Sequence, residues 1–411
     1  MKVIVLAGGY DQIALIQELK SRDCYVILVD YNNEPIAASY ADKHYNDSTM
    51  DIERVRVIAE TEQVKLITTA CTDQALFVAA FVSEKLSLPF PFSSKLACSL
   101  TNKKWMKEVL IKNEIPTARH ILHHGIIDWK ELERLSYPMV FKPVDANSSK
   151  GVSKVESVDE LDMAFTYALK NSRSSIVLSE EFIEGQELSV DSWVDSNGEA
   201  TVLMVSRSLK NASEENGFPI IASLYPARNK EYIEGSITPL IKKIANAFNL
   251  SNTPLLVQVI ASSNDIKVVE LSARMGGGCK HHFLRHVTGV DTIKLLVDVF
   301  LSKKIGFIEP KYQEKFYLMK YIYAENGVFS GVEGMGKLKE NGVIVDYYPT
   351  RKNNSIISGC STSTDRVGAM LLTASNYEEI FMLLEQCYEK ISVPDKNSKV
   401  ELKKIDFHSI A

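Results

Sequence analysis

The first ninety residues alternate between short apolar runs and amphipathic segments, and this alternation restricts the fold more than any other feature of the chain. The apolar runs 2–7, 25–30 and 64–70 predict buried strands. The segments 11–22 and 73–86 predict helices, the second of them capped by Asp73. Strands that alternate with helices usually form a parallel sheet with right-handed crossovers. The sequence therefore predicts an N-terminal α/β domain over residues 1–95.

Length and charge exclude several classes of protein. A chain of 411 residues is too long for one ordinary core, so we expect two or three lobes. The net charge of -5 provides no basic surface, which argues against a nucleic-acid partner. The apolar run before Gly8 is too short for a signal peptide or a membrane span. Six scattered cysteines without a C-x-x-C pair predict reduced thiols in a cytoplasmic protein.

The stretch PMVFKPVDANSSKGV, residues 138–152, places Lys142 inside an apolar strand and a loop of small polar residues after it. A buried lysine is unfavourable unless an anion lies beside it, and a phosphate would be such an anion. Backbone N–H groups of the loop 147–151 could close over phosphate oxygens. The spacing is not that of a Walker A loop, and a surface lysine on an edge strand is the alternative. We expect the loop 146–151 to be mobile without nucleotide, because little buried area opposes its opening.

Acidic residues follow a second apolar strand in SIVLSEEFIEGQELSVD, residues 175–191. The period of a strand places Glu180 and Glu181 on opposite faces, and Glu187 follows after a turn at Gly185. These side chains could form a solvated strand end. Alternatively, their oxygens could accept hydrogen bonds from an adenine amino group and from ribose hydroxyls.

The segment LLVQVIASSNDIKVVELSARMGGG, residues 255–278, predicts a hairpin with Gln258 opposite Glu270. Ser272 lies on the same face as Glu270, and so does Arg274 if the strand continues. Oxygen ligands with few carboxylates suit a Mg²⁺ ion that substrate phosphates mainly hold. A guanidinium suits a phosphate through its two-pronged geometry. A polar sheet face is the simpler interpretation of this hairpin.

Two further motifs are weaker. Gly8 and Gly9, with Asp30 downstream, resemble a dinucleotide fingerprint, but the G-x-G-x-x-G spacing is absent and a tight turn is favoured. The segment GGGCKHHFLRHVTGVD, residues 276–291, contains three histidines without an assigned role: His281, His282 and His286. A metal site is one interpretation, and histidines on a helix surface or in a substrate pocket are the favoured one.

Taken in order, these elements resemble the ATP-grasp family over most of the chain. The resemblance implies an α/β and α+β architecture, the ATP-grasp fold, with a parallel-sheet domain at 1–95 and an ATP-grasp domain at 96–308. A small mobile subdomain would occupy about 117–182. A small C-terminal lid domain would occupy 309–411, where DRVG at 365–368 is typical of enzymes related to biotin carboxylase and to amino-acid ligases.

The resemblance also implies roles for the residues at matching positions. Two lysines, Lys103 and Lys142, would hold the ATP phosphates. A loop that contains Ser148, Ser149 and Gly151 would cover these phosphates. A hinge would hold adenine and ribose, and it comprises Glu180, Glu181, Ile183 and Glu187. The ligands of Mg²⁺, with Mn²⁺ as an alternative ion, would be Gln258, Glu270 and Ser272. The residues expected to act in catalysis are Arg274, Lys142 and Glu270.

Three positions depart from the family pattern. The first metal position is usually acidic and is Gln258 here, and the last is usually Asn and is Ser272. The residue before the first lysine is usually Asp and is Asn102. The departures at the metal positions bear on the affinity for the metal.

The implied activity is that of an ADP-forming carboxylate–amine ligase that makes an amide through an acyl phosphate. Its partners would be a small-molecule carboxylate, such as an amino acid or a sugar acid, and an amine, and the resemblance allows a homodimer. A purine-biosynthesis-type ligase or transferase of the same fold stays open as an alternative. A non-catalytic nucleotide-binding regulator also stays open, because Gln258 and Ser272 replace the usual metal ligands.

Overall fold

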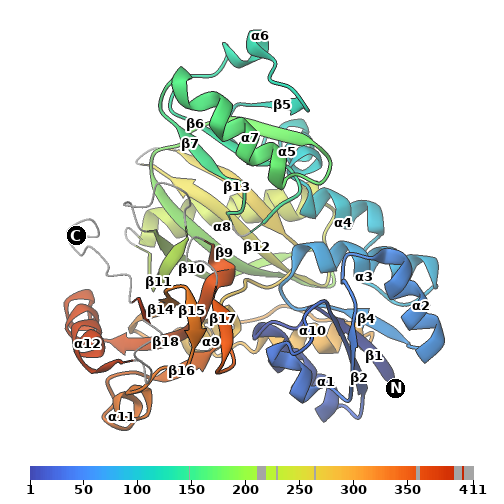
Figure 1. The fold of residues 1–411 in the computed structure, drawn as a ribbon, viewed down its shortest axis with the longest axis vertical. Coiled ribbons are helices and arrows are strands. Elements are labelled where there is room, and N and C mark those ends of the chain that lie inside the picture. The colour runs from blue at the N-terminus through green and yellow to red at the C-terminus, as the bar shows by residue number, and fades with distance from the viewer. Residues whose placement is uncertain are drawn as a thin grey trace.

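The computed structural model describes residues 1–147, 149–210, 219–227, 230–262, 265–357, 362–392 and 400–401. Four sheets organise these residues, and Figure 1 shows the small antiparallel sheet above the largest sheet, with the N-terminal sheet beside it. No helix in these ranges is long and apolar enough to cross a membrane.

The N-terminal sheet is parallel, as predicted, with the strand order β3-β2-β1-β4. Its strands are β1 (Lys2–Leu6), β2 (Tyr25–Asp30), β3 (Lys43–Asn46) and β4 (Leu66–Thr68). The helices of this region are α1 (Asp11–Ser21), η1 (Ile36–Tyr40), α2 (Ile52–Glu62) and α3 (Asp73–Lys85). Because β1 and β4 are neighbours, the loops that lead from them to α1 and α3 lie at the same edge of the sheet.

The glycine pair after β1 forms a tight turn. The Asp30 carboxylate accepts hydrogen bonds from the backbone N–H groups of Gly8 (2.7 Å) and Asn32 (2.8 Å). A Cβ atom on Gly8 would lie 2.5 Å from the Cβ atom of Pro35, so only glycine fits there. These contacts support the tight turn over a dinucleotide site.

The small antiparallel sheet has the order β5-β8-β6-β7 and packs against one helix. Its elements are β5 (His120–His124), α6 (Trp129–Leu132), β6 (Met139–Pro143), β7 (Ser153–Val155), η2 (Val158–Glu160), α7 (Leu161–Asn171) and β8 (Ile176–Glu181). Phe141, Val155, Leu161 and Phe165 are buried in its own small core. The predicted strand with Lys142 is therefore β6, and it lies between two other strands rather than at an edge.

The largest sheet has nine strands, and it continues past residue 309 because β11 pairs with β14. The division into three domains stays a prediction. The strands are β9 (Gln186–Val194), β10 (Ala200–Lys210), β11 (Ile220–Tyr225), β12 (Thr253–Ala261), β13 (Ile266–Ser272), β14 (Phe316–Ala324), β16 (Asp346–Pro349), β18 (Arg366–Ala374) and β19 (Val400–Glu401). Gln258 pairs with Glu270 across β12 and β13, which confirms the predicted register of this hairpin.

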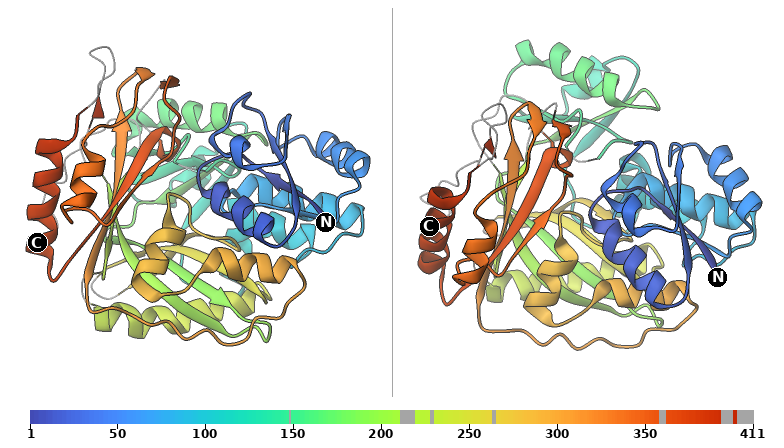
Figure 2. Two further views of the ribbon diagram at one scale, coloured as in Figure 1. Left: turned by 90° about the horizontal axis from the view of Figure 1, so that it is seen from below. Right: turned by 60° about the horizontal axis from the view of Figure 1, so that its bottom comes forward.

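The remaining elements surround this sheet. They are α4 (Ser94–Thr101), α5 (Lys103–Lys112), α8 (Lys230–Ala247), α9 (Lys280–Thr288), α10 (Thr292–Phe300), β15 (Gly327–Phe329), α11 (Met335–Glu340), β17 (Ser355–Ile357), η3 (Ser363–Asp365) and α12 (Tyr377–Lys390). In Figure 2 the N-terminal sheet and the C-terminal strands lie on opposite sides of the molecule, and α9 and α10 lie between them. The loop between Arg274 and α9 reaches both sides: the backbone N–H groups of Gly278 and Cys279 donate to the Asp11 carboxylate, and a Cβ atom on Gly278 would lie 2.4 Å from the Arg366 guanidinium.

Phe283 on α9 is completely buried in the core of the largest sheet. We expect Phe283→Ala to reduce the free energy of unfolding by about 3–5 kcal/mol, because the substitution removes buried apolar surface and leaves a cavity. Denaturant unfolding measures this change. Phe307→Ala is the matched control, since Phe307 is 75% exposed and its loss is expected to be nearly neutral. Equal effects of the two substitutions would contradict the packing described for α9.

Candidate active site

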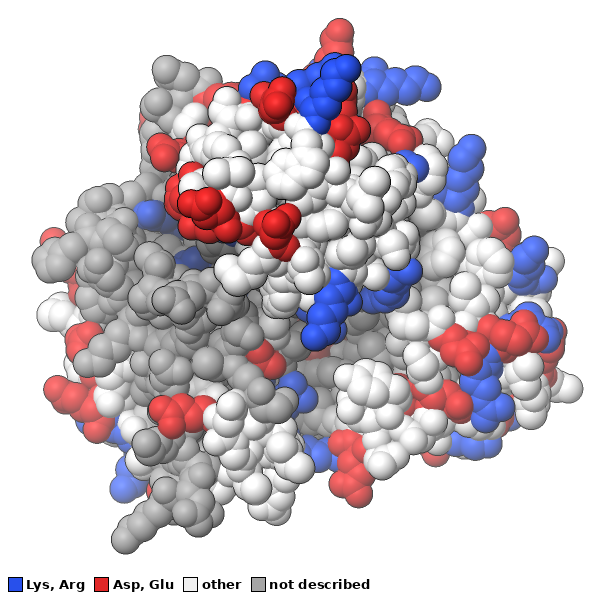
Figure 3. Space-filling view, turned by 45° about the horizontal axis from the view of Figure 1, so that its top comes forward, with Lys and Arg blue, Asp and Glu red and all other residues white. Residues whose placement is uncertain are grey.

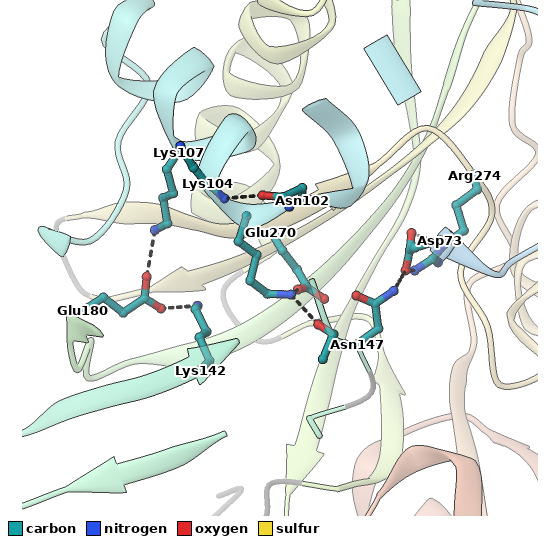
Figure 4. A network of polar contacts seen from close by, with 11 residues as sticks. Asp73, Asn102, Lys104, Lys107, Lys142, Asn147, Glu180, Glu270 and Arg274 are labelled. Carbon is teal, nitrogen blue, oxygen red and sulfur yellow. Dashed lines mark hydrogen bonds and ion pairs between the residues drawn. The ribbon is translucent and has the colours of Figure 1, made fainter. Parts of the chain in front are cut away.

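Lys142 lies beside a carboxylate, not in an empty apolar strand. On the neighbouring strand β8, Glu180 pairs with Val140, which places its side chain diagonally opposite Lys142. The Lys142 ammonium group donates a hydrogen bond to one carboxylate oxygen of Glu180. The ammonium group of Lys107 on α5 lies 2.9 Å from the other oxygen. Figure 4 shows the two lysines approaching Glu180 from different elements.

All three side chains of this cluster are buried, with Lys142, Glu180 and Lys107 exposed by 4%, 6% and 1%. Glu180 therefore supplies an anion beside Lys142, so the burial of this lysine does not by itself indicate a phosphate, and its phosphate-binding role stays a prediction. Two ammonium groups share one carboxylate, however, so the cluster keeps a net positive charge and remains suited to a phosphate. The sequence prediction missed Lys107, although it follows Lys103 by four residues on one helix and so lies on the same face.

The charges around Glu180 shift its protonation. Burial alone would raise the pKa of the Glu180 carboxyl group, but Lys107 and Lys142 lower the pKa from its ordinary value of 4.5 to about 2. Burial lowers the pKa of the Lys107 ammonium group, and Glu180 partly opposes that effect. Glu180 is therefore ionised at neutral pH.

Lys103 connects the covering loop to the hairpin. Its ammonium group donates to the backbone carbonyl of Ala146 (2.8 Å) and lies 3.2 Å from the Glu270 carboxylate. Asn102 is the N-cap of α5, and its side chain accepts a hydrogen bond from the backbone N–H of Lys104 (3.0 Å). Asn and Asp are equally good at such a position, so the departure at Asn102 is structurally neutral.

The three predicted metal ligands line one pocket together with Lys103 and Arg274. Glu270 is partly exposed at this pocket, with 33% of its side chain accessible. The buried Ser272 hydroxyl lies beside the Asp73 carboxylate and helps to lower its pKa. A carboxylate, an amide oxygen and a hydroxyl in one pocket are oxygen donors that fit Mg²⁺.

Arg274 is held by a residue of the N-terminal sheet region. Its Nε donates to Asp73 Oδ1 (2.7 Å) and its Nη2 to Asp73 Oδ2 (2.5 Å), while Nη1 donates to the Met275 carbonyl (2.8 Å). The prediction that Asp73 caps α3 is wrong, since its side chain caps nothing there. The Asp73 carboxylate also accepts a hydrogen bond from the Asn147 side chain (2.8 Å).

The covering loop is tied down at its start. Ala146 accepts a hydrogen bond from Lys103 and Asn147 donates one to Asp73, so these two residues have partners without nucleotide, and the expected mobility of the loop 146–151 stays a prediction. Ser149 has a φ of 62° and Gly151 a φ of 75°, and a Cβ atom on Gly151 would lie 2.7 Å from Asn171. Ser148 lies outside the described residues.

The hinge residues Glu181 and Ile183 line a second pocket together with Ile260 and Lys267. Glu181 also forms an ion pair with Arg119. Gln258 and Ile260 are two residues apart on β12, so both pockets lie along the same face of one strand. Glu187 pairs with Ile260 in the neighbouring strand β9, and its carboxylate forms an ion pair with Lys210.

The three histidines of α9 do not converge on a metal site. No group of three or more His, Cys, Asp or Glu side chains able to hold a metal occurs among the described residues. The ring of His282 stacks on Tyr348 at 4.2 Å between centroids, and burial lowers its pKa to about 4. His281 lies 3.4 Å from the Asp11 carboxylate. Packing roles agree with these positions better than metal binding does.

Glu180→Gln tests the charged cluster. We expect a loss of about 3–5 kcal/mol in the free energy of unfolding, because two buried lysines lose their shared anion. The lowered pKa of Glu180 also means that the wild-type protein loses stability as the pH falls from about 4.5 to about 2, and the variant should lack this part of the loss. Urea unfolding across this pH range measures both effects. The control is Glu181→Gln, which breaks the partly exposed ion pair with Arg119 and should cost little stability. An equally large loss in the free energy of unfolding of this control would contradict the account.

Comparison with known proteins finds a domain match within this chain. Residues 135–282 match the model of the ATP-grasp domain. The carbamoyl phosphate synthase large chain of Clostridium botulinum is 22% identical over 324 residues, which cover 74% of this chain and 29% of that protein. The chain thus spans less than a third of that relative's length.

Two solved structures have the same fold. The L-amino acid ligase of Bacillus licheniformis superposes with a TM-score of 0.79 at 19% identity, covering 96% of this chain and 99% of that one. The biotin carboxylase domain dimer of the Hydrogenobacter thermophilus 2-oxoglutarate carboxylase, in complex with MgADP, superposes with a TM-score of 0.77 at 16% identity, covering 100% and 95%. Residues 135–282 therefore match an ATP-grasp domain, and the chain has the fold of the ATP-grasp proteins with which it superposes.

Proposed function

We propose that this protein is an ATP-dependent, ADP-forming carboxylate–amine ligase. One observation supports this most strongly: three neighbouring ion-pair groups, with four cations and three carboxylates in all, lie on β6, β8, α5, the start of α3 and the β12–β13 hairpin with the residues that follow it. Its members are Lys103, Lys107, Lys142, Arg274, Glu180, Glu270 and Asp73. The excess of positive charge, next to oxygen donors for a metal, is the environment that a nucleoside triphosphate requires.

The two pockets would bind different parts of the nucleotide. Adenine and ribose would lie at the hinge pocket near Ile183 and Glu187, and the phosphates would lie between Lys142 and Lys103. Bound Mg²⁺, held by Glu270, Gln258 and Ser272, would neutralise charge on the phosphates. The covering loop would exclude water from the phosphates.

The chemistry needs positioning more than covalent participation by the protein. A substrate carboxylate oxygen attacks the γ-phosphorus, the bond to the β,γ-bridging oxygen breaks, and ADP leaves. An unprotonated amine then attacks the acyl carbon, the bond between that carbon and the phosphate oxygen breaks, and phosphate and one proton are released. Lys142, Lys103 and Arg274 would hold the transferred group and stabilise its charge.

The proposal extends to the class of substrate. An amino acid or a sugar acid is the proposed carboxylate, and the likeness to an L-amino acid ligase over nearly the whole chain supports the former. A purine-biosynthesis-type ligase or transferase is the second candidate. A homodimer is also proposed, since one similar structure is a dimer. Acidic and basic side chains are interspersed on the face shown in Figure 3, which gives no support to a nucleic-acid partner.

The proposal is tested by measuring ADP and phosphate release with Mg²⁺ across panels of carboxylates and amines. We expect ADP release to depend on one class of carboxylate, and amide formation to require an amine as well. Nucleotide binding without release of ADP by any carboxylate would favour the non-catalytic regulator, and release only with purine-pathway substrates would favour the second candidate.

Lys142→Ala should weaken the binding of a non-hydrolysable ATP analogue by about 1.5–3 kcal/mol, because a charge-assisted contact to a phosphate is lost. Calorimetry measures the affinity. The variant also leaves Glu180 with Lys107 alone, so its unfolding must be measured in parallel. Lys170→Ala, at an exposed lysine of the same subdomain, is the control. Unchanged affinity in the Lys142 variant would remove it from the phosphate site.

Glu270→Gln should reduce ADP formation far more than Gln258→Ala does, because Glu270 is the only carboxylate among the three proposed ligands. Initial rates over a range of Mg²⁺ concentrations are the measurement. Gln258→Glu, which restores the usual family residue, should lower the Mg²⁺ concentration needed for half-maximal rate. Near-normal turnover of the Glu270 variant at saturating Mg²⁺ would show that this hairpin does not hold the metal.

A further inference from the structure

Asp73 occupies only one edge of the Arg274 guanidinium. An arginine presents five N–H donors in a fixed planar fork. Asp73 accepts from Nε and Nη2, which form one edge, and the Met275 carbonyl accepts from Nη1. One N–H on Nη1 and one on Nη2 therefore have no acceptor among the described residues. These two N–H groups are the donors with which Arg274 could bind a second anion.

This ion pair is well protected from solvent. Asp73 is 8% exposed, and 12% of the Arg274 side chain is accessible. Burial would raise the pKa of Asp73, but Arg274 holds it below its ordinary value. Arg274 has several rotatable bonds, and a buried bidentate partner removes most of that freedom before any ligand binds.

The same carboxylate reaches the covering loop. Asp73 Oδ2 accepts from Nη2 of Arg274 and from Nδ2 of Asn147. Figure 4 shows Asn147, Asp73 and Arg274 as one connected group, apart from the cluster around Glu180. Asp73 is the first residue of α3, which packs on the N-terminal sheet. The N-terminal region therefore contributes a side chain to a site whose other residues come from the small antiparallel sheet, α5 and the largest sheet.

We propose that Asp73 is a positioning residue that aligns Arg274 and the start of the covering loop for transfer of the phosphoryl group to the substrate carboxylate. The inference rests on the proposed function for its catalytic readout. It assigns no contact between Asp73 and substrate. Its role is to fix the free edge of Arg274 toward the transferred phosphoryl group, and to hold Asn147 so that the loop begins from a set position.

The test compares Asp73→Asn, which keeps the shape and removes the charge, with the control Asp51→Ala. Asp51 is a true helix cap in the same sheet region, accepting from the backbone N–H of Arg54 (2.9 Å). Both variants should lose some stability, but only Asp73→Asn should lower kcat, by about tenfold or more, with the affinity for an ATP analogue changed by less than about threefold. Asp73→Glu, which keeps the charge, should recover part of the lost kcat.

A second comparison separates positioning from general damage. In an Arg274→Ala background, Asp73→Asn should have no further effect on kcat, because the group that it positions is absent. Additive losses in the double variant, or a kcat in Asp73→Asn equal to that of the Asp51 control, would overturn the inference.

Amide hydrogen exchange supplies a readout that needs no turnover. Exchange at residues 146–151 should be faster in Asp73→Asn than in the wild type and unchanged in Asp51→Ala. Absence of carboxylate-dependent ADP release in the wild type would refute the proposed function while leaving this test intact. Unchanged exchange in Asp73→Asn would refute the link between Asp73 and the loop, whatever the substrate.

Discussion

Burial of positive charge is the constraint on which the rest of this site depends. Lys107 and Lys142 are both almost fully buried, and a single carboxylate, Glu180, makes this tolerable. A buried ammonium group without an anion would lose its proton or unfold the site. One carboxylate for two lysines keeps the site folded and still leaves a positive charge for a phosphate. The order of β6 and β8 and the docking of α5 are the means by which the fold brings these three residues together.

The N-terminal parallel sheet contributes through the loops at its carboxyl edge. β1 and β4 are neighbours, and the helices that follow them begin with Asp11 and Asp73. Asp11 accepts hydrogen bonds from the backbone N–H groups of Gly278 (3.0 Å) and Cys279 (2.8 Å), and Asp73 holds Arg274. Both carboxylates thus fix the segment that follows β13, the strand that carries the proposed metal ligands Glu270 and Ser272. The sheet acts as a rigid support for groups whose chemistry lies elsewhere in the chain.

Local patterns predicted much of this structure. Alternating strands and helices identified the parallel sheet, and the hairpin pattern predicted the pair of Gln258 and Glu270, which forms where the ladder shifts its register between Gln258 and Val259. These features depend on neighbours in sequence, so the sequence contains the information directly. The resemblance to ATP-grasp proteins added the ATP-grasp fold, which the superposed structures share.

Long-range pairs were not predictable in the same way. Asp73 and Arg274 are 201 residues apart, and nothing near Asp73 distinguishes it from a helix cap. Lys107 has a buried partner only because the fold brings α5 near Glu180 on β8, so the spacing of four residues between Lys103 and Lys107 can be interpreted only from the structure. The anion beside Lys142 was assigned to a ligand for the same reason. Tertiary packing determines which charged residues on different helices and strands form ion pairs. A single sequence shows the charged residues but not how they pair.

The central claim is that the excess positive charge of this site binds a triphosphate. Calorimetric titration of the wild-type protein with AMP, ADP and a non-hydrolysable ATP analogue, each with Mg²⁺, measures this most directly. If the account is correct, affinity rises steeply from AMP to the triphosphate, and added salt weakens the triphosphate more than AMP. Equal affinities for AMP and the triphosphate, or no binding of either, would contradict it.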